Sequence, residues 1–348
     1  MTIERSPRVA FWVTAGGRDG GGHLSRAMAL LSWLPNGAET VLVLPDNEYT
    51  RTVAELGGPA VVRQAEDRPG SPRMIFQGLA EHGWTDGPDL VVVDGIWAEQ
   101  EGLPAELRAR WPKTRIAVVG GPENLWLDVE LRVLPDAGYR PPLADEDDAP
   151  GRLVGGAPYV ILGRRGDPDP WRLPPDPARV LVTAGNADPF DVTGLFVRAL
   201  ELCSVPVRGR VVLGGGFLHA ERVRDRVASS DADLELVERA HDLRPLMAGS
   251  DLALSAYGIT CMELAQMGVP AITVTHTQAD VEWAHRVAAL GFLEVGGWVE
   301  TADPDDLAET VDRLLLAPAE LRRMSEAGRR QIDGRGAERV AGELEKLL

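Results

Sequence analysis

A glycine-rich segment with a single histidine is the first part of the sequence that could do chemistry. Residues 14–26 read TAGGRDGGGHLSR and lie between an apolar run and a helix predicted over residues 24–33. Glycines let backbone amides approach a ligand closely, and the start of a helix carries a partial positive charge that suits a diphosphate. Histidine titrates near neutral pH, so His23 is a candidate general base, with Gly21 and Gly22 as candidate substrate contacts. The alternative is that the glycines only turn the chain and His23 caps the helix.

A second segment joins a predicted strand to a helix in the other half of the chain. Residues 255–270 read SAYGITCMELAQMGVP, so Gly258, Ile259 and Thr260 would present amides and one hydroxyl to a phosphate at the helix N-terminus. Glu263 follows one turn later, where a carboxylate can accept both ribose hydroxyls, as acidic residues do in other Rossmann-type sites. An exposed helix position is the alternative, but Glu263 stands in the apolar run CMELAQM, where an unpaired carboxylate is costly. The segment therefore predicts a nucleotide site.

Further small and polar residues follow other predicted strands. The candidates for contact with nucleotide or sugar are Gly185, Asn186, Gly214, Gly215, Phe217 and Gln278. The first two could approach phosphate, the next three leave room for a base, and the glutamine could bind sugar or ribose, although plain turns are an alternative for the glycines. Asp188 is expected to cap the next helix, whereas His276 is either a capping or a surface histidine.

The first half of the chain holds two more candidates. Asp94 ends the predicted strand in VVVDGIW, so its carboxylate is a second candidate base, although capping a helix is the commoner role for such a residue. Trp97 follows three residues later and is a candidate substrate contact. Ser25 and Arg26, next to the histidine, are expected to be packing or surface residues.

The scaffold that must position these loops follows from hydrophobic patterning. Short β-branched runs alternate with longer amphipathic segments, a pattern typical of βαβ units around parallel sheets. Strands are predicted at residues 9–13, 40–44, 90–94, 115–119, 180–184, 209–214, 234–238, 252–256 and 271–275, and helices at residues 24–33, 99–110 and 307–316 among others. Ligands of open parallel sheets bind beyond the carboxyl ends of the strands, so the loops that follow the strands are where chemistry is expected.

The patterning also predicts an α/β protein with two Rossmann-like domains. The 348 residues exceed what one compact core usually serves. Residues 163–177 contain five prolines and no apolar periodicity, which indicates a linker. We therefore expect an N-terminal domain at residues 1–162 and a nucleotide-binding domain at residues 178–330, with parallel sheets facing an interdomain cleft. Residues 331–348 are expected to form a helix that packs back toward the first domain.

Composition disfavours several classes of function. A net charge of −17 disfavours nucleic acid and anionic membranes as partners, because both attract basic surfaces. Cys203 and Cys261 offer no metal-ligand spacing, and no apolar run approaches the roughly 20 residues of a membrane span. No export signal is expected at the N-terminus. The sequence thus predicts a soluble cytoplasmic protein that binds a small molecule and needs no metal or other cofactor, and it leaves the oligomeric state open.

Four sequence blocks resemble a known group of enzymes. The blocks GGGHLSR, APYVILGRR, VLVTAGNADP and HDLRPLMAGSDLALSAYGITCMELAQMGVPAITVTHTQ are similar to the UDP-sugar hydrolases of pseudaminic acid biosynthesis and to related spore-coat polysaccharide proteins. More distantly they resemble the glycosyltransferase that forms lipid II. The resemblance implies the GT-B fold, His23 as the catalytic base, nucleotide contacts at Gly258, Thr260 and Glu263, and a further contact at Gln278.

The chain departs from the hydrolases on the sugar side. Residues 12–14 are Trp-Val-Thr where the hydrolases carry Arg-x-Asp, and residues 95–97 are Gly-Ile-Trp where they carry a tyrosine. Gly120 and Gly121 replace paired aspartates, and Thr277 replaces an asparagine. The pattern indicates a retained nucleotide site and a rebuilt sugar pocket.

The favoured function at this stage is a nucleotide-sugar hydrolase. We expect an inverting, metal-independent displacement at the anomeric carbon of a UDP- or CMP-linked sugar, with a histidine base that activates water. Two alternatives stay open, namely an inverting glycosyltransferase with a soluble acceptor and a catalytically silent nucleotide-sugar binding protein.

Overall fold

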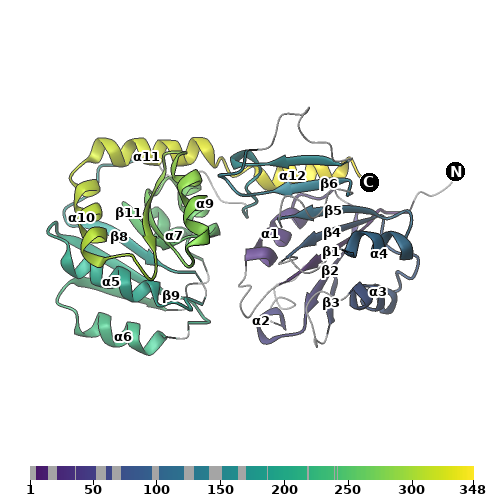
Figure 1. The fold of residues 1–348 in the computed structure, drawn as a ribbon, viewed down its shortest axis with the longest axis horizontal. Coiled ribbons are helices and arrows are strands. Elements are labelled where there is room, and N and C mark those ends of the chain that lie inside the picture. Colours follow the sequence, from purple (N-terminus) through teal and green to yellow (C-terminus); the bar gives the residue numbers. More distant parts are fainter. Residues whose placement is uncertain are drawn as a thin grey trace. The chain divides into compact units, whose positions relative to one another are not determined.

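The chain folds into two compact α/β units. A computed structural model of the protein describes residues 5–14, 22–35, 37–51, 60–64, 72–95, 102–120, 129–140, 151–163, 170–185, 187–217, 219–238, 240 and 242–348. Unit 1 comprises Met1–Arg164 and Gly334–Leu348, and unit 2 comprises Arg165–Asp333 (Figure 1). The chain therefore passes from one unit to the other twice.

Unit 1 is built on a parallel sheet with the strand order β3-β2-β1-β4-β5-β6-β7. Its described strands are β1 (Arg8–Val13), β2 (Glu39–Pro45), β3 (Ala60–Gln64), β4 (Leu90–Asp94), β5 (Arg115–Val119), β6 (Leu131–Leu134) and β7 (Arg152–Gly155). Its described helices are α1 (Gly22–Leu31), α2 (Glu48–Arg51), α3 (Pro72–Glu81), α4 (Leu103–Arg110) and α12 (Gly336–Glu345), with a short 3-10 helix, η3 (Ala157–Tyr159).

Alternation along the central strand explains why both faces of this sheet are covered. Successive side chains of a strand point to opposite faces. Phe11 belongs to the apolar cluster that α1 and α12 contribute to, whereas Trp12 belongs to the cluster with α3 and α4. The C-terminal helix adds Val340 and Leu344 to the first cluster, so it is an integral part of unit 1.

Unit 2 repeats the same topology with the strand order β10-β9-β8-β11-β12-β13. Its described strands are β8 (Ala178–Thr183), β9 (Val207–Leu213), β10 (Asp233–Glu238), β11 (Leu252–Ala256), β12 (Ala271–Thr275) and β13 (Leu293–Trp298). Its described helices are α5 (Val192–Leu202), α6 (Ala220–Ser229), α7 (Arg244–Ala248), α8 (Ile259–Met267), α9 (Ala279–Ala288), α10 (Pro304–Leu315) and α11 (Pro318–Gln331).

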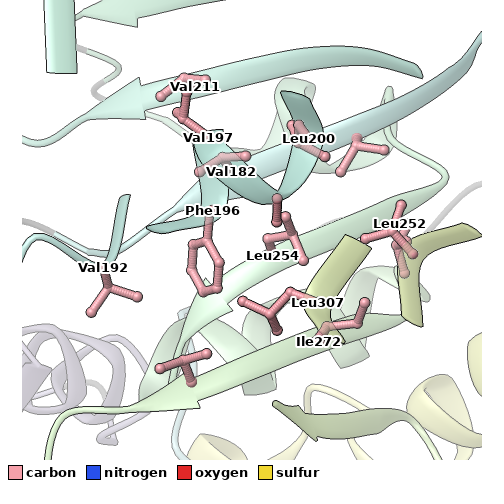
Figure 2. Packing of buried hydrophobic residues seen from close by; sticks show 14 of the residues in the cluster. Val182, Val192, Phe196, Val197, Leu200, Val211, Leu252, Leu254, Ile272 and Leu307 are labelled. Carbon is pink, nitrogen blue, oxygen red and sulfur yellow. The ribbon is translucent and has the colours of Figure 1, made fainter. Parts of the chain in front are cut away.

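The core of unit 2 is an apolar cluster between its sheet and the helices α5, α10 and α11. Phe196 of α5 is fully buried and lies among side chains of β8, β11 and β12 (Figure 2). Leu307 of α10 packs into the same cluster beside Ile272. Strands buried on both faces need continuous apolar runs, and LALSA of β11 and AITVT of β12 are buried at every residue.

The predicted strands are confirmed, with ends that differ from the prediction by two residues or fewer. Of the helix predicted at residues 99–110, α4 begins at Leu103, where Gly102 is the N-cap residue and a proline occupies the first turn, while residues 99–101 lie outside the described residues. The strands β3, β6, β7 and β13 were not predicted. Both sheets place their first and fourth strands side by side, which creates a topological switch point in each unit between β1 and β4 and between β8 and β11.

Candidate functional site

The switch point of unit 1 brings the glycine-loop helix and the end of β4 together. Val13 at the end of β1 pairs with Asp94 at the end of β4, and the Thr14 backbone N–H donates to the Asp94 carbonyl at 3.1 Å. The helix that follows β1, α1, begins at Gly22. His23 and Arg26 stand three residues apart on α1, so their side chains share one face of the helix.

His23, Arg26 and Asp94 form one hydrogen-bonded cluster. The His23 Nδ1 atom lies 2.7 Å from Asp94 Oδ1. Arg26 donates from Nε to Asp94 Oδ2 at 3.0 Å and from Nη2 to Asp94 Oδ1 at 2.6 Å, which is a bidentate ion pair. Arg26 Nη2 also lies 2.7 Å from His23 Nδ1. Two neighbouring side chains of α1 thus converge on one carboxylate that lies about 70 positions further along the sequence.

The side chains of this cluster are largely buried, which strengthens the interactions between their charges. The Asp94 residue is 1% exposed, while the side chains of His23 and Arg26 are 19% and 17% exposed. Burial by itself would raise the pKa of Asp94, but the Arg26 charge and the hydrogen bonds from both partners lower this pKa below its ordinary value. Asp94 is therefore an ionised carboxylate over the whole neutral range.

The cluster corrects one expectation and bears on the roles of Asp94 and His23. Arg26 is not a plain packing or surface residue, because its guanidinium is paired with a buried carboxylate, whereas Ser25 is exposed as expected. The Asp94 carboxylate accepts from side chains and, among the described residues, from no backbone N–H at a helix start. The His23 ring likewise faces Asp94. The H-x-x-R spacing on one helix face is the signal that could have identified Arg26 from the sequence.

The switch point of unit 2 lies where β8 and β11 end. Thr183 pairs with Ser255 in register, and the two strands lead to Gly185 and Gly258. Gly258 has φ 159° and ψ −162°, a region of backbone conformation that is open essentially to glycine alone. A Cβ atom placed on Gly185 or on Gly258 would meet no described residue within 4 Å, which leaves room for a ligand to approach the backbone at both positions.

The helix α8 starts directly at this point. Ile259 and Thr260 form its first turn and are half-buried, and the first N–H groups of a helix have no partner within the helix. Glu263 is half-buried one turn further, between the buried Met262 and Leu264. The predicted phosphate and ribose residues therefore lie on the first two turns of one helix at the switch point.

The remaining candidates follow the strands on either side. Gly214, Gly215 and Phe217 follow β9, the neighbour of β8, where Phe217 packs against the core cluster. Gln278 is exposed at the N-cap position of α9, after β12, the neighbour of β11. Four adjacent strands thus bring the described candidates of unit 2 to one edge of its sheet. Gly22 begins α1 at the unit 1 site, whereas Gly21, Trp97 and Asn186 lie outside the described residues.

Sequence reasoning missed an aromatic contact at this edge. The Phe190 ring lies 5.3 Å from the His276 ring, centroid to centroid, so the loops after β8 and β12 meet across the end of β11. Burial lowers the pKa of His276, although the carboxylates of Asp188 and Asp280 act in the opposite direction. Asp188 also caps α5 as expected, because it accepts from the backbone N–H groups of Val192 and Thr193.

Neither a metal centre nor a membrane span is found in the described part of the chain. Within those residues, no group of three or more His, Cys, Asp and Glu side chains is placed to hold a metal ion. The helices among them are all too short or too polar to cross a bilayer.

Comparison with curated proteins relates the chain to one kind of transferase. No family model matches the chain. A UDP-N-acetylglucosamine--N-acetylmuramyl-(pentapeptide) pyrophosphoryl-undecaprenol N-acetylglucosamine transferase from Corynebacterium efficiens is 28% identical over 206 residues, which are 56% of this chain and 54% of the relative. The chain thus spans about half the length of that relative. A transferase of the same name from Phenylobacterium zucineum is 28% identical over 96% of this chain and 97% of its own.

Comparison with solved structures shows the GT-B fold. The glycotransferase of kitacinnamycin has a TM-score of 0.70 at 18% identity and covers 99% of both chains. MurG from Acinetobacter baumannii has a TM-score of 0.69 at 16% identity, covering 98% of this chain and all of its own. A complex of Staphylococcus aureus MnaA with UDP has a TM-score of 0.64 at 14% identity and covers 98% of each chain. Both curated relatives above are glycosyltransferases and hence enzymes, which agrees with the expectation that this chain is an enzyme.

Proposed function

We propose that the protein is a GT-B glycosyltransferase that moves a sugar from a UDP-sugar donor to a hydroxyl acceptor. The observation that carries the catalytic part of the proposal, a base for displacement at the anomeric carbon, is the buried Asp94 carboxylate bound to His23 Nδ1 at the unit 1 switch point. The names of the curated relatives support a UDP-linked donor and a transfer reaction. They support the transferase over the hydrolase that the sequence pattern favoured.

In this proposal His23 is the general base and Asp94 its orienting partner. When Nδ1 carries the ring proton, it donates to Asp94 Oδ1 and leaves the Nε2 lone pair available. Nε2 takes the proton of the acceptor hydroxyl as its oxygen bonds to the anomeric carbon. The bond between that carbon and the diphosphate breaks, the diphosphate leaves as an anion, and Asp94 stabilises the resulting imidazolium. Asp94 thus orients the base and is not the base itself.

Unit 2 would hold the nucleotide in the same reaction. The first amides of α8 and the Thr260 hydroxyl would bind the diphosphate, and Glu263 would accept the ribose hydroxyls. Fixed N–H groups at a helix start favour the negative charge that develops on a departing diphosphate. The glycines after β8 and β9 would allow close approach of the nucleotide. Gln278, Gly21, Gly22 and Trp97 are the proposed contacts on the sugar and acceptor side.

Dependence on an acceptor separates transfer from the other functions. We expect that a panel of UDP-sugars that includes UDP-N-acetylglucosamine releases no UDP with enzyme alone, and that release begins when a soluble or lipid-linked hydroxyl acceptor is added. Coupled detection of UDP measures the rate in each arm. Release at the same rate in water alone would establish a hydrolase, because water then replaces the acceptor. Tight UDP binding with no release in any arm would identify a silent binding protein.

The Gly258→Ala variant tests the nucleotide site of unit 2. Holding alanine at φ 159° costs about 1–3 kcal/mol, so we expect the loop to shift and the UDP dissociation constant to rise roughly 10- to 100-fold. Isothermal titration with UDP measures the change. Gly342→Ala is the matched control, since Gly342 stands in α12 with nothing within 4 Å of an added Cβ. Unchanged affinity in Gly258→Ala would remove this loop from the nucleotide site.

A further inference from the structure

The proposed base has a second neighbour whose role the transfer reaction does not yet explain. Arg26 uses two N–H groups to bind both oxygens of Asp94, and this pair is almost closed to water. Gly120 at the end of β5 borders the same guanidinium, because a Cβ added there would lie 3.7 Å from Arg26 Nη2. The Arg26 guanidinium therefore lies beside Asp94 at the end of β4 and Gly120 at the end of β5.

The carboxylate depends on this arginine for its charge. Burial disfavours an ionised carboxyl group, and a nearby cation restores it. Without the guanidinium, Asp94 would keep the bond to His23 as its one remaining partner in the cluster, and it would tend to take up a proton. A protonated Asp94 can donate to Nδ1, which would move the ring proton to Nε2 and occupy the lone pair that the reaction needs.

We infer that Arg26 is a positioning residue that keeps Asp94 ionised and thereby holds His23 in the tautomer with Nδ1 protonated and Nε2 free. The inference rests on the proposed role of His23 as the base. The 2.7 Å contact between Arg26 Nη2 and Nδ1 acts against this tautomer, because a guanidinium N–H can only donate, but the charge of Asp94 opposes that effect. Arg26 already directs two N–H groups at Asp94, and a full negative charge 2.7 Å from Nδ1 favours an N–H at that nitrogen.

The test compares Arg26→Met with Arg26→Lys in the full chain. Outer partners of metal-bound histidines typically change activity 10- to 100-fold, and we expect Arg26→Met, which acts on a histidine base in the same indirect way, to lower kcat by roughly that factor. The UDP dissociation constant, a property of unit 2, should not change, and Arg26→Lys should recover part of the rate because it restores a cation. The ¹⁵N signals of the His23 ring, assigned with a His23→Gln variant, should show Nδ1 protonated in the wild type and a mixture of tautomers in Arg26→Met.

A matched control separates positioning from general stability. Arg51 makes a bidentate ion pair with Asp46 in unit 1, but its side chain is 63% exposed, so Arg51→Met should leave kcat and the His23 signals unchanged. The inference is overturned if Arg26→Met keeps the wild-type rate and tautomer, or if Nδ1 is unprotonated in the wild type. The ¹⁵N spectrum of the His23 ring in the wild type tests the inference even if Arg26→Met does not fold. If His23→Ala itself keeps normal turnover, the proposed role of His23 as the base fails as well, whereas an inactive His23→Ala beside an active Arg26→Met removes only this inference.

Discussion

The His23→Ala variant is expected to lose roughly 10²- to 10⁴-fold in kcat, the range that a positioned general base contributes. The loss follows because Nε2 is the proposed proton acceptor, and no other described side chain is bonded to Asp94 apart from Arg26, which cannot accept a proton. Steady-state turnover with UDP-sugar and acceptor measures the effect. UDP affinity should stay at the wild-type value, since the proposed nucleotide contacts all lie in unit 2.

A second histidine provides the comparison for this variant. His285 is exposed on α9 and has no proposed contact with nucleotide or sugar, so His285→Ala should keep the wild-type kcat. If His23→Ala turns over at a rate near that of His285→Ala, His23 is not the base. If His23→Ala instead loses UDP binding in proportion to turnover, the histidine acts in binding and not in proton transfer.

The strands with continuous apolar runs could be predicted from the sequence, while very short strands and a strand interrupted by glycines could not. LVVVD of β4 and AITVT of β12 are buried at every residue, and a run of that kind has few alternatives to a central strand. By contrast, β6 and β7 are four residues long, and arginine stands second in β6 and first in β7. The strand β13 contains two adjacent glycines. Patterning carries little information in a four-residue strand or in one interrupted by glycines, and pairing with the neighbouring strand defines these elements.

The candidate site shows a similar division between local and tertiary information. The glycine loops and the α8 segment were recognisable because phosphate binding needs small residues before a helix, which is a local pattern. The pairing of Arg26 with Asp94 spans 68 positions and depends on β1 lying next to β4. The residues of these loops do not determine the order of the strands in the sheet. The contact of Phe190 with His276 escaped prediction for the same reason, because it joins loops on both sides of β11.

The class of reaction was easier to infer than its acceptor. A base beside an ionised carboxylate and a helix start for a diphosphate serve hydrolysis and transfer equally, because only the attacking oxygen differs between the two. The residues that would distinguish water from an acceptor lie on the sugar side, where Gly21 and Trp97 are candidates outside the described residues. Sequence similarity to transferases, and not the geometry of the base, is what favours transfer.

The Asp94→Asn variant should lose on the order of 10³- to 10⁴-fold in kcat, because an amide can donate to Nδ1 and so favours the tautomer with Nε2 blocked. Breaking a buried pair with Arg26 should also cost about 3–5 kcal/mol in the free energy of unfolding. Because the pKa of Asp94 is lowered in the folded state, the wild-type pair stabilises the fold above the carboxyl's ordinary pKa and loses this contribution as pH falls through the folded value. Asp94→Asn should therefore show a weaker loss of stability in acid, measured by thermal unfolding across pH.

Asp251→Asn is the matched control, since Asp251 is a 5%-exposed carboxylate bound by both oxygens to Arg179 with no histidine bonded to it among the described residues. It should be destabilised without the selective loss of kcat, and equal losses of kcat in the two variants would refute the orienting role of Asp94.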